Sequence, residues 1–138
     1  MDFHFASAWE VVADKFPNRV ATISDDKPLS WQEFERRASC IASLLEEHGL
    51  GPDSKAGLYL HNCSEYQEAQ FGIFKVGGCP INVNYRYKSD ELVYLLDNSD
   101  AEAVFFQSCY AMRIWEIRER LPKVKLFVQI DDGTESLL

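Results

Sequence analysis

Two cations stand close together in the middle of the chain, in a polar and aromatic loop at positions 84–88 (Asn-Tyr-Arg-Tyr-Lys). Arg86 and Lys88 follow an apolar run that is expected to be a strand, and a helix is expected directly after them. Open α/β sheets bind ligands at the carboxyl ends of their strands, and a helix N-terminus favours anions. The spacing makes Arg86 and Lys88 candidate phosphate-binding residues. Two ordinary cations on a solvated loop are the alternative.

His61 and Cys63 form a second pair with reactive side chains, at the end of an earlier apolar run. A histidine beside a thiol could hold a metal ion or serve a nucleophile as its base. No third partner stands near them, and the four cysteines form no CxxC pair. We therefore expect no catalytic residue and no metal ligand in this chain.

The glycines of residues 72–78 have the spacing of a phosphate loop. The Lys and Ser/Thr that such a loop needs do not follow them. A helix is also expected to end here, and a helix C-terminus carries negative partial charge, which repels phosphate. The sequence therefore does not predict a phosphate loop at this place.

The elements that position these residues alternate between strand and helix. Apolar runs that indicate strands begin near four residues, with helical patterns between them: Lys55, Cys79, Ala103 and Lys125. Stacked βα units with such a regular step form open, mainly parallel sheets flanked by helices. We expect an α/β fold in which residues 55–132 supply the four-strand series and residues 133–138 form a tail.

Residues 1–54 carry a different pattern. An apolar stripe over residues 5–16 predicts an amphipathic first helix. Val20–Ser24 and Lys27–Ser30 flank a pair of aspartates and predict a β-hairpin, which a long helix follows. The expected N-terminal part is therefore a helix, a hairpin and a long helix.

Three helix starts carry capping signals. Ser30 with Glu33 forms a capping box for the long helix. At the helix expected near Ser89, the Lys88 ammonium cannot accept a capping bond, so Ser89 is the expected cap and the exact helix boundary is left open. The helix after the first strand of the series has two candidate boxes: Asn62 with Glu65, or Ser64 with Gln67.

Composition limits the class of protein. The chain has 138 residues, enough for one domain with a sizeable core. Its net charge of -8 argues against nucleic-acid and anionic-membrane partners. No apolar run approaches the roughly 20 residues that span a bilayer, and the first residues lack the pattern of a signal peptide. We expect a single domain without a membrane span, located in the cytoplasm.

Five stretches agree in order and spacing with one known family: residues 28–34 (PLSWQEF), 58–66 (LYLHNCSEY), 80–87 (PINVNYRY), 90–92 (DEL) and 94–98 (YLLDN). Together they resemble the N-terminal part of AMP-forming acyl-CoA synthetases. These enzymes belong to the adenylate-forming superfamily, with luciferases and peptide-synthetase adenylation domains. The resemblance implies a partial N-terminal domain of that superfamily.

The resemblance also implies a two-step ligase chemistry. The family joins a carboxylic acid to ATP as an acyl-adenylate and then transfers the acyl group to coenzyme A, with Mg²⁺ offsetting phosphate charge. The family's phosphate loop, adenylate motifs and catalytic lysine lie beyond the region of resemblance, and none occurs here. The chain is therefore expected to be a fragment that does not catalyse adenylation alone. ATP, Mg²⁺ and coenzyme A would be cofactors of the complete enzyme only.

One role carries over residue by residue. In some acyl-CoA synthetases the arginine of an Asn-x-Arg loop contacts phosphates of coenzyme A, and that position is Arg86 here, with Lys88 beside it. The expected partner is the missing C-terminal remainder of the enzyme, or a second copy of the chain paired through uncovered apolar surface. The alternative is a stand-alone, non-enzymatic binding or interaction module, which a partner chain could complete.

Overall fold

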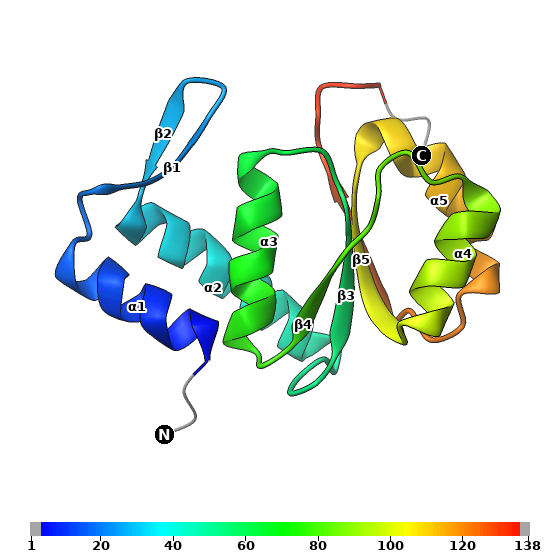
Figure 1. The fold of residues 1–138 in the computed structure, drawn as a ribbon, viewed down its shortest axis with the longest axis horizontal. Coiled ribbons are helices and arrows are strands. Elements are labelled where there is room, and N and C mark those ends of the chain that lie inside the picture. Colours follow the sequence, from blue (N-terminus) through cyan, green and yellow to red (C-terminus); the bar gives the residue numbers. More distant parts are fainter. Residues whose placement is uncertain (1–3, 136–138) are drawn as a thin grey trace. The chain divides into compact units, whose positions relative to one another are not determined.

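The computed structural model describes residues 4–135 and contains two units (Figure 1). Unit 1 comprises the residues up to Asp53 together with Asn62–Gly78. Unit 2 comprises Ser54–His61 and the residues from Cys79 onward. The sequence-based expectation of a single domain stays a prediction.

Unit 1 contains three helices and a hairpin: α1 (Phe5–Lys15), β1 (Val20–Ser24), β2 (Lys27–Ser30), α2 (Trp31–Glu47) and α3 (Ser64–Lys75). The hairpin has the predicted bounds. Asp25 and Asp26 both adopt positive φ angles, 47° and 60°, which is the conformation of the tight turn that antiparallel strands favour. Aspartate tolerates this region better than most residues, so the pair of aspartates accounts for the turn.

Aromatic rings form the core of unit 1. Phe71 in α3 is fully buried, and its ring centroid lies 5.1 Å from that of Trp9 and 5.0 Å from that of Phe34. Helices α2 and α3 approach closely at Gly72, where an added Cβ would stand 2.5 Å from the Ile41 Cγ2. The stripe predicted from Phe5 onward is only partly inward, because Phe5 itself is 68% exposed.

The helix caps follow the sequence signals only in part. The Ser30 hydroxyl accepts the Glu33 amide at 3.2 Å, as predicted, but the Glu33 carboxylate binds Arg36 instead of closing the box. Both boxes predicted for α3 are wrong. Cys63 is the N-cap and makes no capping bond through its side chain, while the Ser64 hydroxyl donates to Glu68 at 2.8 Å.

Unit 2 contains a parallel four-strand sheet in the order β4-β3-β5-β6, built from β3 (Lys55–Tyr59), β4 (Cys79–Asn82), β5 (Ala101–Gln107) and β6 (Leu126–Ile130). The predicted α/β fold with a mainly parallel sheet is therefore confirmed. Helices α4 (Ser89–Asn98) and α5 (Ala111–Ile117) lie on one side of the sheet in Figure 1. Their buried residues Leu92, Leu96 and Ile114 pack with the sheet in one core cluster.

Two details of unit 2 differ from the prediction. Strand β5 begins at Ala101 and includes Gln107, so it is longer than the apolar run of residues 103–106. The helical pattern expected between the third and fourth strands is not one continuous α-helix but consists of α5 with short 3₁₀ turns, Ser108–Tyr110 and Arg118–Arg120, at its two ends. None of the helices within residues 4–135 is both long and apolar enough to cross a membrane.

Candidate phosphate-binding loop

The loop of residues 84–88 connects β4 to α4 at the carboxyl edge of the sheet in unit 2. Asn84 organises its backbone. The side-chain oxygen of Asn84 accepts the Arg86 amide at 3.0 Å, and the Asn84 carbonyl accepts the Tyr87 amide, also at 3.0 Å. Asparagine favours such turns because its short side chain reaches the backbone two residues on. The turn leads the chain directly into the first turn of α4.

The N-cap of α4 is Lys88, not Ser89. The Glu91 carboxylate accepts the Lys88 amide at 2.8 Å, which is one half of a capping box. The other half does not form, because an ammonium group has no lone pair with which to accept a bond. The side chain of Lys88 is therefore not needed by the cap.

Both predicted site residues lie in this loop, and both are exposed. Within residues 4–135, neither cation takes part in an ion pair. The Arg86 guanidinium lies 5.7 Å from the centre of the Tyr85 ring. Asp90 and Glu91 add negative charge to the first turn of α4 and weaken the attraction of its N-terminus for anions. Affinity for phosphate at this place therefore depends on the two cations.

Two residues that the sequence analysis did not select, Tyr59 and Arg113, hold the loop through hydrogen bonds. The Tyr59 hydroxyl donates to the Tyr87 carbonyl at 2.9 Å, and Arg113 Nη1 donates to the same oxygen at 2.9 Å. Arg113 Nη1 also lies 2.6 Å from the Tyr59 hydroxyl. Burial raises the pKa of Tyr59, although the Arg113 charge acts in the opposite direction. The phenol is therefore protonated at neutral pH and able to donate.

One signal for Arg113 was present in the sequence. The apolar stripe of the predicted helix runs through Tyr110, Ile114 and Ile117, and Arg113 stands on the same face, three residues after Tyr110. A cation on the buried side of a helix needs a partner. No local sequence pattern identifies that partner, which is the Tyr87 carbonyl, 26 residues away.

His61 is fully engaged in hydrogen bonds within unit 2. Its amide and its Nδ1 lie 2.8 and 2.9 Å from Gln107 Oε1, and its Nε2 lies 2.9 Å from the Tyr110 hydroxyl. The backbone amide can only donate, so the Gln107 oxygen is the atom that faces it and Nδ1 carries the proton. Nε2 then accepts from Tyr110, whose pKa burial raises to about 12.

Cys63 is not an activated thiol. Burial raises the pKa of this thiol, which reduces the thiolate fraction at neutral pH. No group of three or more potential metal ligands occurs within residues 4–135. The expectation that the chain holds no catalytic residue and no metal ligand stays a prediction.

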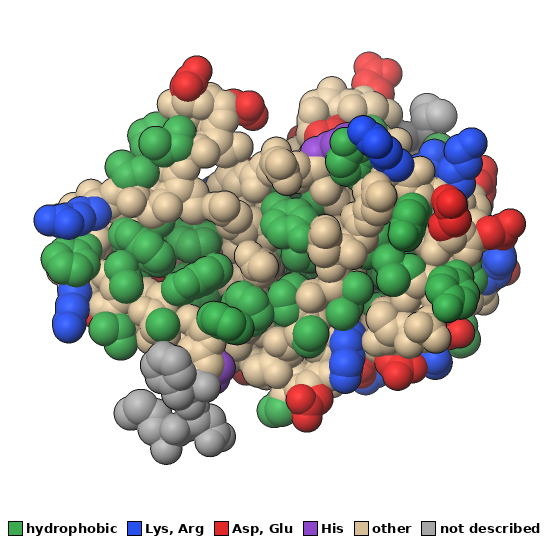
Figure 2. All heavy atoms as spheres, viewed as in Figure 1, with side chains coloured by type: hydrophobic (Ala, Val, Ile, Leu, Met, Phe, Trp, Pro, Cys, Tyr) green, Lys and Arg blue, Asp and Glu red, His purple; other side chains and the backbone are tan. Residues whose placement is uncertain are grey.

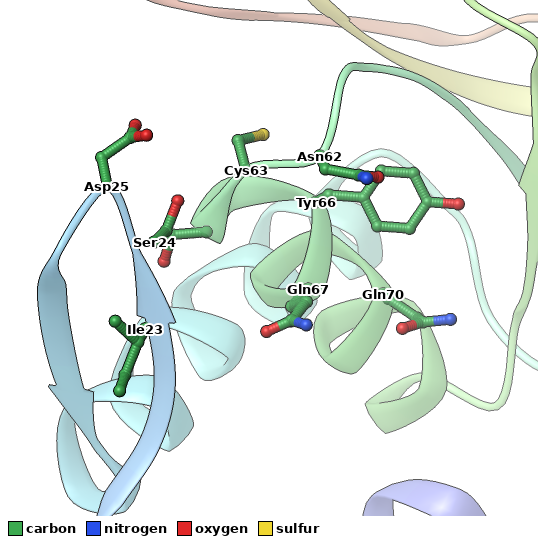
Figure 3. Close-up of a pocket in the computed structure, with 9 residues that line it drawn as sticks. Ile23, Ser24, Asp25, Asn62, Cys63, Tyr66, Gln67 and Gln70 are labelled. Atoms are coloured by element: carbon green, nitrogen blue, oxygen red, sulfur yellow. The ribbon is translucent and has the colours of Figure 1, made fainter.

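A separate pocket of about 410 Å³ lies within unit 1, between the hairpin tip and the first half of α3 (Figure 3). Ser24 and Asp25 contribute to it from the hairpin, and Cys63 and Gln67 from the helix. None of its lining residues is a Lys or an Arg. Its amide donors, Asn62, Gln67 and Gln70, are neutral. Since hydrogen bonds from charged donors are stronger, this pocket is a weaker candidate for a phosphate site than the loop in unit 2.

Comparison with known proteins identifies the family. The family described as AMP-binding enzyme matches residues 9–137. A 3-oxocholest-4-en-26-oate–CoA ligase of Rhodococcus rhodochrous is 37% identical over 135 residues, which are 98% of this chain and 24% of the relative. A medium/long-chain-fatty-acid–CoA/3-oxocholest-4-en-26-oate–CoA ligase of Mycobacterium marinum is 38% identical over 132 residues, 96% of this chain and 24% of the relative.

Solved structures agree in fold. A provisionally assigned long-chain-fatty-acid CoA ligase of Rhodopseudomonas palustris matches with a TM-score of 0.88 and 28% identity, over 97% of this chain and 34% of that one. The N-terminal domain of FACL13 from Mycobacterium tuberculosis matches with a TM-score of 0.85 and 19% identity, over 92% and 33% of the two chains, which shows a shared fold alone. The chain spans about a quarter of the length of the curated relatives named above.

Proposed function

Since the chain belongs to the AMP-binding enzyme family, we propose that it supplies the N-terminal part of an AMP-forming acyl-CoA ligase. In this proposal the loop of residues 84–88 contacts the 3′-phosphate of coenzyme A through Arg86, with Lys88 as a second cation. The observation that carries the proposal is the exposed Arg86, which forms no ion pair within residues 4–135, on a fixed backbone at the carboxyl edge of the sheet. A guanidinium presents paired donors that match a phosphate.

The chain is proposed to be non-catalytic on its own. Its carboxyl-edge side chains are committed to one another, as the His61 bonds to Gln107 and Tyr110 illustrate. ATP and Mg²⁺ would then be handled by the remainder of the ligase, and coenzyme A would be the only cofactor that touches these residues. A cytoplasmic location stays a prediction.

The relatives point to the class of acid. Both curated relatives act, by name, on 3-oxocholest-4-en-26-oate, and one also acts on medium- and long-chain fatty acids. We therefore propose a large apolar carboxylic acid as the substrate of the complete ligase.

Exposed apolar side chains in unit 1 support the proposal that a partner covers part of its surface. Figure 2 shows hydrophobic side chains at the surface over α1 and the hairpin. The most exposed of them are Phe5, Val11, Val20 and Ile23, each more than half exposed. Contiguous apolar surface of this kind marks contact sites. The proposed occupant is the remainder of the ligase, because the chain covers only 24% of its relatives.

Light scattering on the purified chain tests this surface. If it is normally covered, the isolated chain self-associates as its concentration rises, and an Ile23→Ser, Val20→Ser variant stays monomeric at the same concentration. A wild-type chain that remains monomeric at millimolar concentration contradicts the uncovered surface.

Pyrophosphate release tests the absence of catalysis. The purified chain is incubated with ATP, Mg²⁺ and decanoate, and the Mycobacterium marinum ligase serves as the active control. No release above the blank is expected from the chain. Release that requires both ATP and the acid would contradict the proposal.

Titration with two ligands tests the loop. Coenzyme A and dephospho-coenzyme A differ only in the 3′-phosphate, and the backbone amide signals of residues 84–88 report binding. We expect larger shifts and tighter binding with coenzyme A, and loss of that preference in Arg86→Gln. The matched control is Lys27→Gln, which removes an exposed cation from the hairpin. Equal responses to both ligands in the wild-type chain contradict the phosphate contact.

A further inference from the structure

The Tyr87 carbonyl is held by side chains from two elements that are distant in the sequence. Tyr59 ends β3 and Arg113 lies in α5, and each donates to this oxygen at 2.9 Å. Arg113 Nη1 also donates to the Tyr59 hydroxyl at 2.6 Å, so the three groups form a closed triangle. A carbonyl oxygen has two lone pairs and can accept both donors. The bond from the guanidinium is charge-assisted and stronger than a neutral one.

The held carbonyl lies between the two cations of the loop. On its C-terminal side, Glu91 accepts the Lys88 amide at 2.8 Å. On its N-terminal side, Asn84 accepts the amides of Arg86 and Tyr87, each at 3.0 Å. The Arg86 backbone is therefore fixed from both directions, while its side chain is exposed.

Tyr59 itself is held rigidly. Its side chain is fully buried, and its ring stacks on that of Tyr110 with the centroids 4.3 Å apart. The Arg113 guanidinium lies 5.9 Å from the centre of the Tyr110 ring. The Tyr59 hydroxyl and Arg113 therefore connect the loop to β3 and α5 and fix its position.

We infer that Arg113, together with the Tyr59 hydroxyl, is a positioning residue that orients Arg86 toward the 3′-phosphate of coenzyme A. The inference rests on the proposed function, because it concerns the same loop. Arg113 acts through the Tyr87 carbonyl and not on the phosphate. Its loss removes one of the two bonds to the Tyr87 carbonyl and loosens the Tyr87–Lys88 peptide, one residue beyond Arg86. The loop then samples more orientations before it binds. The expected result is weaker discrimination between coenzyme A and dephospho-coenzyme A.

A double-mutant cycle tests this inference. The dissociation constants of both ligands are measured by amide shifts for the wild-type chain, Arg86→Gln, Arg113→Met and the double variant. One charge-assisted contact gives a preference of roughly ten-fold for coenzyme A. We expect Arg86→Gln to abolish the preference and Arg113→Met to remove most of it. The double variant should match Arg86→Gln, because Arg113 acts through Arg86.

Two further variants separate positioning from stability. Arg113→Lys keeps a cationic donor and should restore most of the preference, whereas Tyr59→Phe removes only the hydroxyl and should lower it. Arg36→Gln removes an exposed guanidinium that pairs with Glu33 in α2, so it serves as the control and should bind like the wild type. Thermal unfolding of each variant confirms that the chain is folded under the titration conditions.

The two proposals fail in different ways. If Arg113→Met is folded and keeps the wild-type preference, or if the double variant binds coenzyme A more weakly than Arg86→Gln does, positioning by Arg113 is overturned and the phosphate contact stands. If the wild-type chain shows no preference, the proposed function is overturned and the inference about Arg113 falls with it.

Discussion

The two units keep their structure by different means. In unit 1 the rings of Trp9, Phe34 and Phe71 meet within 5.9 Å of one another at the junction of three helices. At the carboxyl edge of unit 2, hydrogen bonds to backbone groups hold the loop of residues 84–88. Ring packing supplies stability in proportion to buried area, whereas directed bonds fix orientation.

The same contrast applies to the charges. In unit 1 the Lys75 ammonium contacts Glu10 at 2.7 Å and Glu35 at 2.5 Å, and its side chain is only 11% exposed. The single charge of that lysine, in α3, forms ion pairs with α1 and α2 and so joins the three helices. In unit 2 the cation of Arg86 is exposed, and only the backbone around it is held. The charge of Lys75 in unit 1 therefore serves the structure, whereas the charge of Arg86 in unit 2 is available for a ligand.

The largest expected effect is on the ring cluster. Phe71→Ala removes a fully buried ring, and we expect it to lower the free energy of unfolding by about 3–5 kcal/mol. Phe5→Ala is the control at a ring that is 68% exposed, and it should cost less than about 1 kcal/mol. Denaturant unfolding measures both. Equal losses in the two variants would show that unit 1 is not held by its buried rings.

The next effect concerns the contact between α2 and α3. Gly72→Ala adds a Cβ within 2.5 Å of the Ile41 Cγ2 and 3.0 Å of the Ala38 carbonyl. Overpacking of this kind costs about 1–3 kcal/mol, part of which the better helix propensity of alanine offsets. Gly51→Ala, where nothing lies within 4 Å of the added atom, should be close to neutral. A Gly72→Ala chain as stable as the wild type would contradict the close approach.

Lys75→Met should lower the free energy of unfolding by about 1–2 kcal/mol at pH 7, because two carboxylates lose their partner. The Lys75 ammonium lowers the pKa of Glu35 below its ordinary value of 4.5, against the effect of burial. Because the pKa of Glu35 is lower in the folded chain, ionised Glu35 stabilises the folded chain above pH 4.5. That contribution is lost as the pH falls through the folded-state pKa. The difference between the wild type and Lys75→Met should therefore shrink below pH 4.5. Lys27→Met, at an exposed position, is the control.

Arg86→Gln should leave stability almost unchanged, within about 0.5 kcal/mol, because the side chain is exposed. Thermal unfolding provides the measurement. Together with the loss of preference for coenzyme A, this result would separate the ligand contact from the fold. A clear drop in stability would mean that Arg86 is part of the scaffold, as Lys75 is in unit 1.

The smallest expected effect concerns the reactivity of Cys109, which follows β5 at the carboxyl edge of the sheet in unit 2. Burial raises the pKa of the Cys109 thiol to about 11, and the Asp132 carboxylate contributes to the rise. Asp132→Asn should lower this pKa and accelerate alkylation of Cys109 by iodoacetamide at pH 8, since the thiolate is the reacting form. Mass spectrometry of the Cys109 peptide follows the rate. An unchanged rate would show that burial alone controls the thiol.

Local patterns in the sequence predicted much of the fold. The bounds of β1 and β2 agree with the structure, because turn residues and apolar periodicity define them locally. The predicted Ser64 cap of α3 failed for a long-range reason. The carboxylate of Glu68 is buried and pairs with Arg37 of α2 at 2.9 Å, and it also receives the Ser64 hydroxyl. That pairing exists only once the two helices have packed.

The sequence also predicted only part of the candidate site. The order of strand, loop and helix placed Arg86 and Lys88 correctly in one exposed loop. Tyr59 and Arg113 were missed because their shared acceptor, the Tyr87 carbonyl, lies 28 and 26 residues away in the sequence. A pattern along the chain cannot report a contact that the sheet and α5 create in three dimensions.

Shift mapping with coenzyme A over the whole chain tests the central claim most directly. The account predicts that the amides of residues 84–88 in unit 2 respond, that dephospho-coenzyme A produces a weaker response there, and that Arg86→Gln removes the difference. The amides around Cys63 and Gln67 in unit 1 should not move. A response centred on the unit 1 pocket, with residues 84–88 unchanged, would contradict the account.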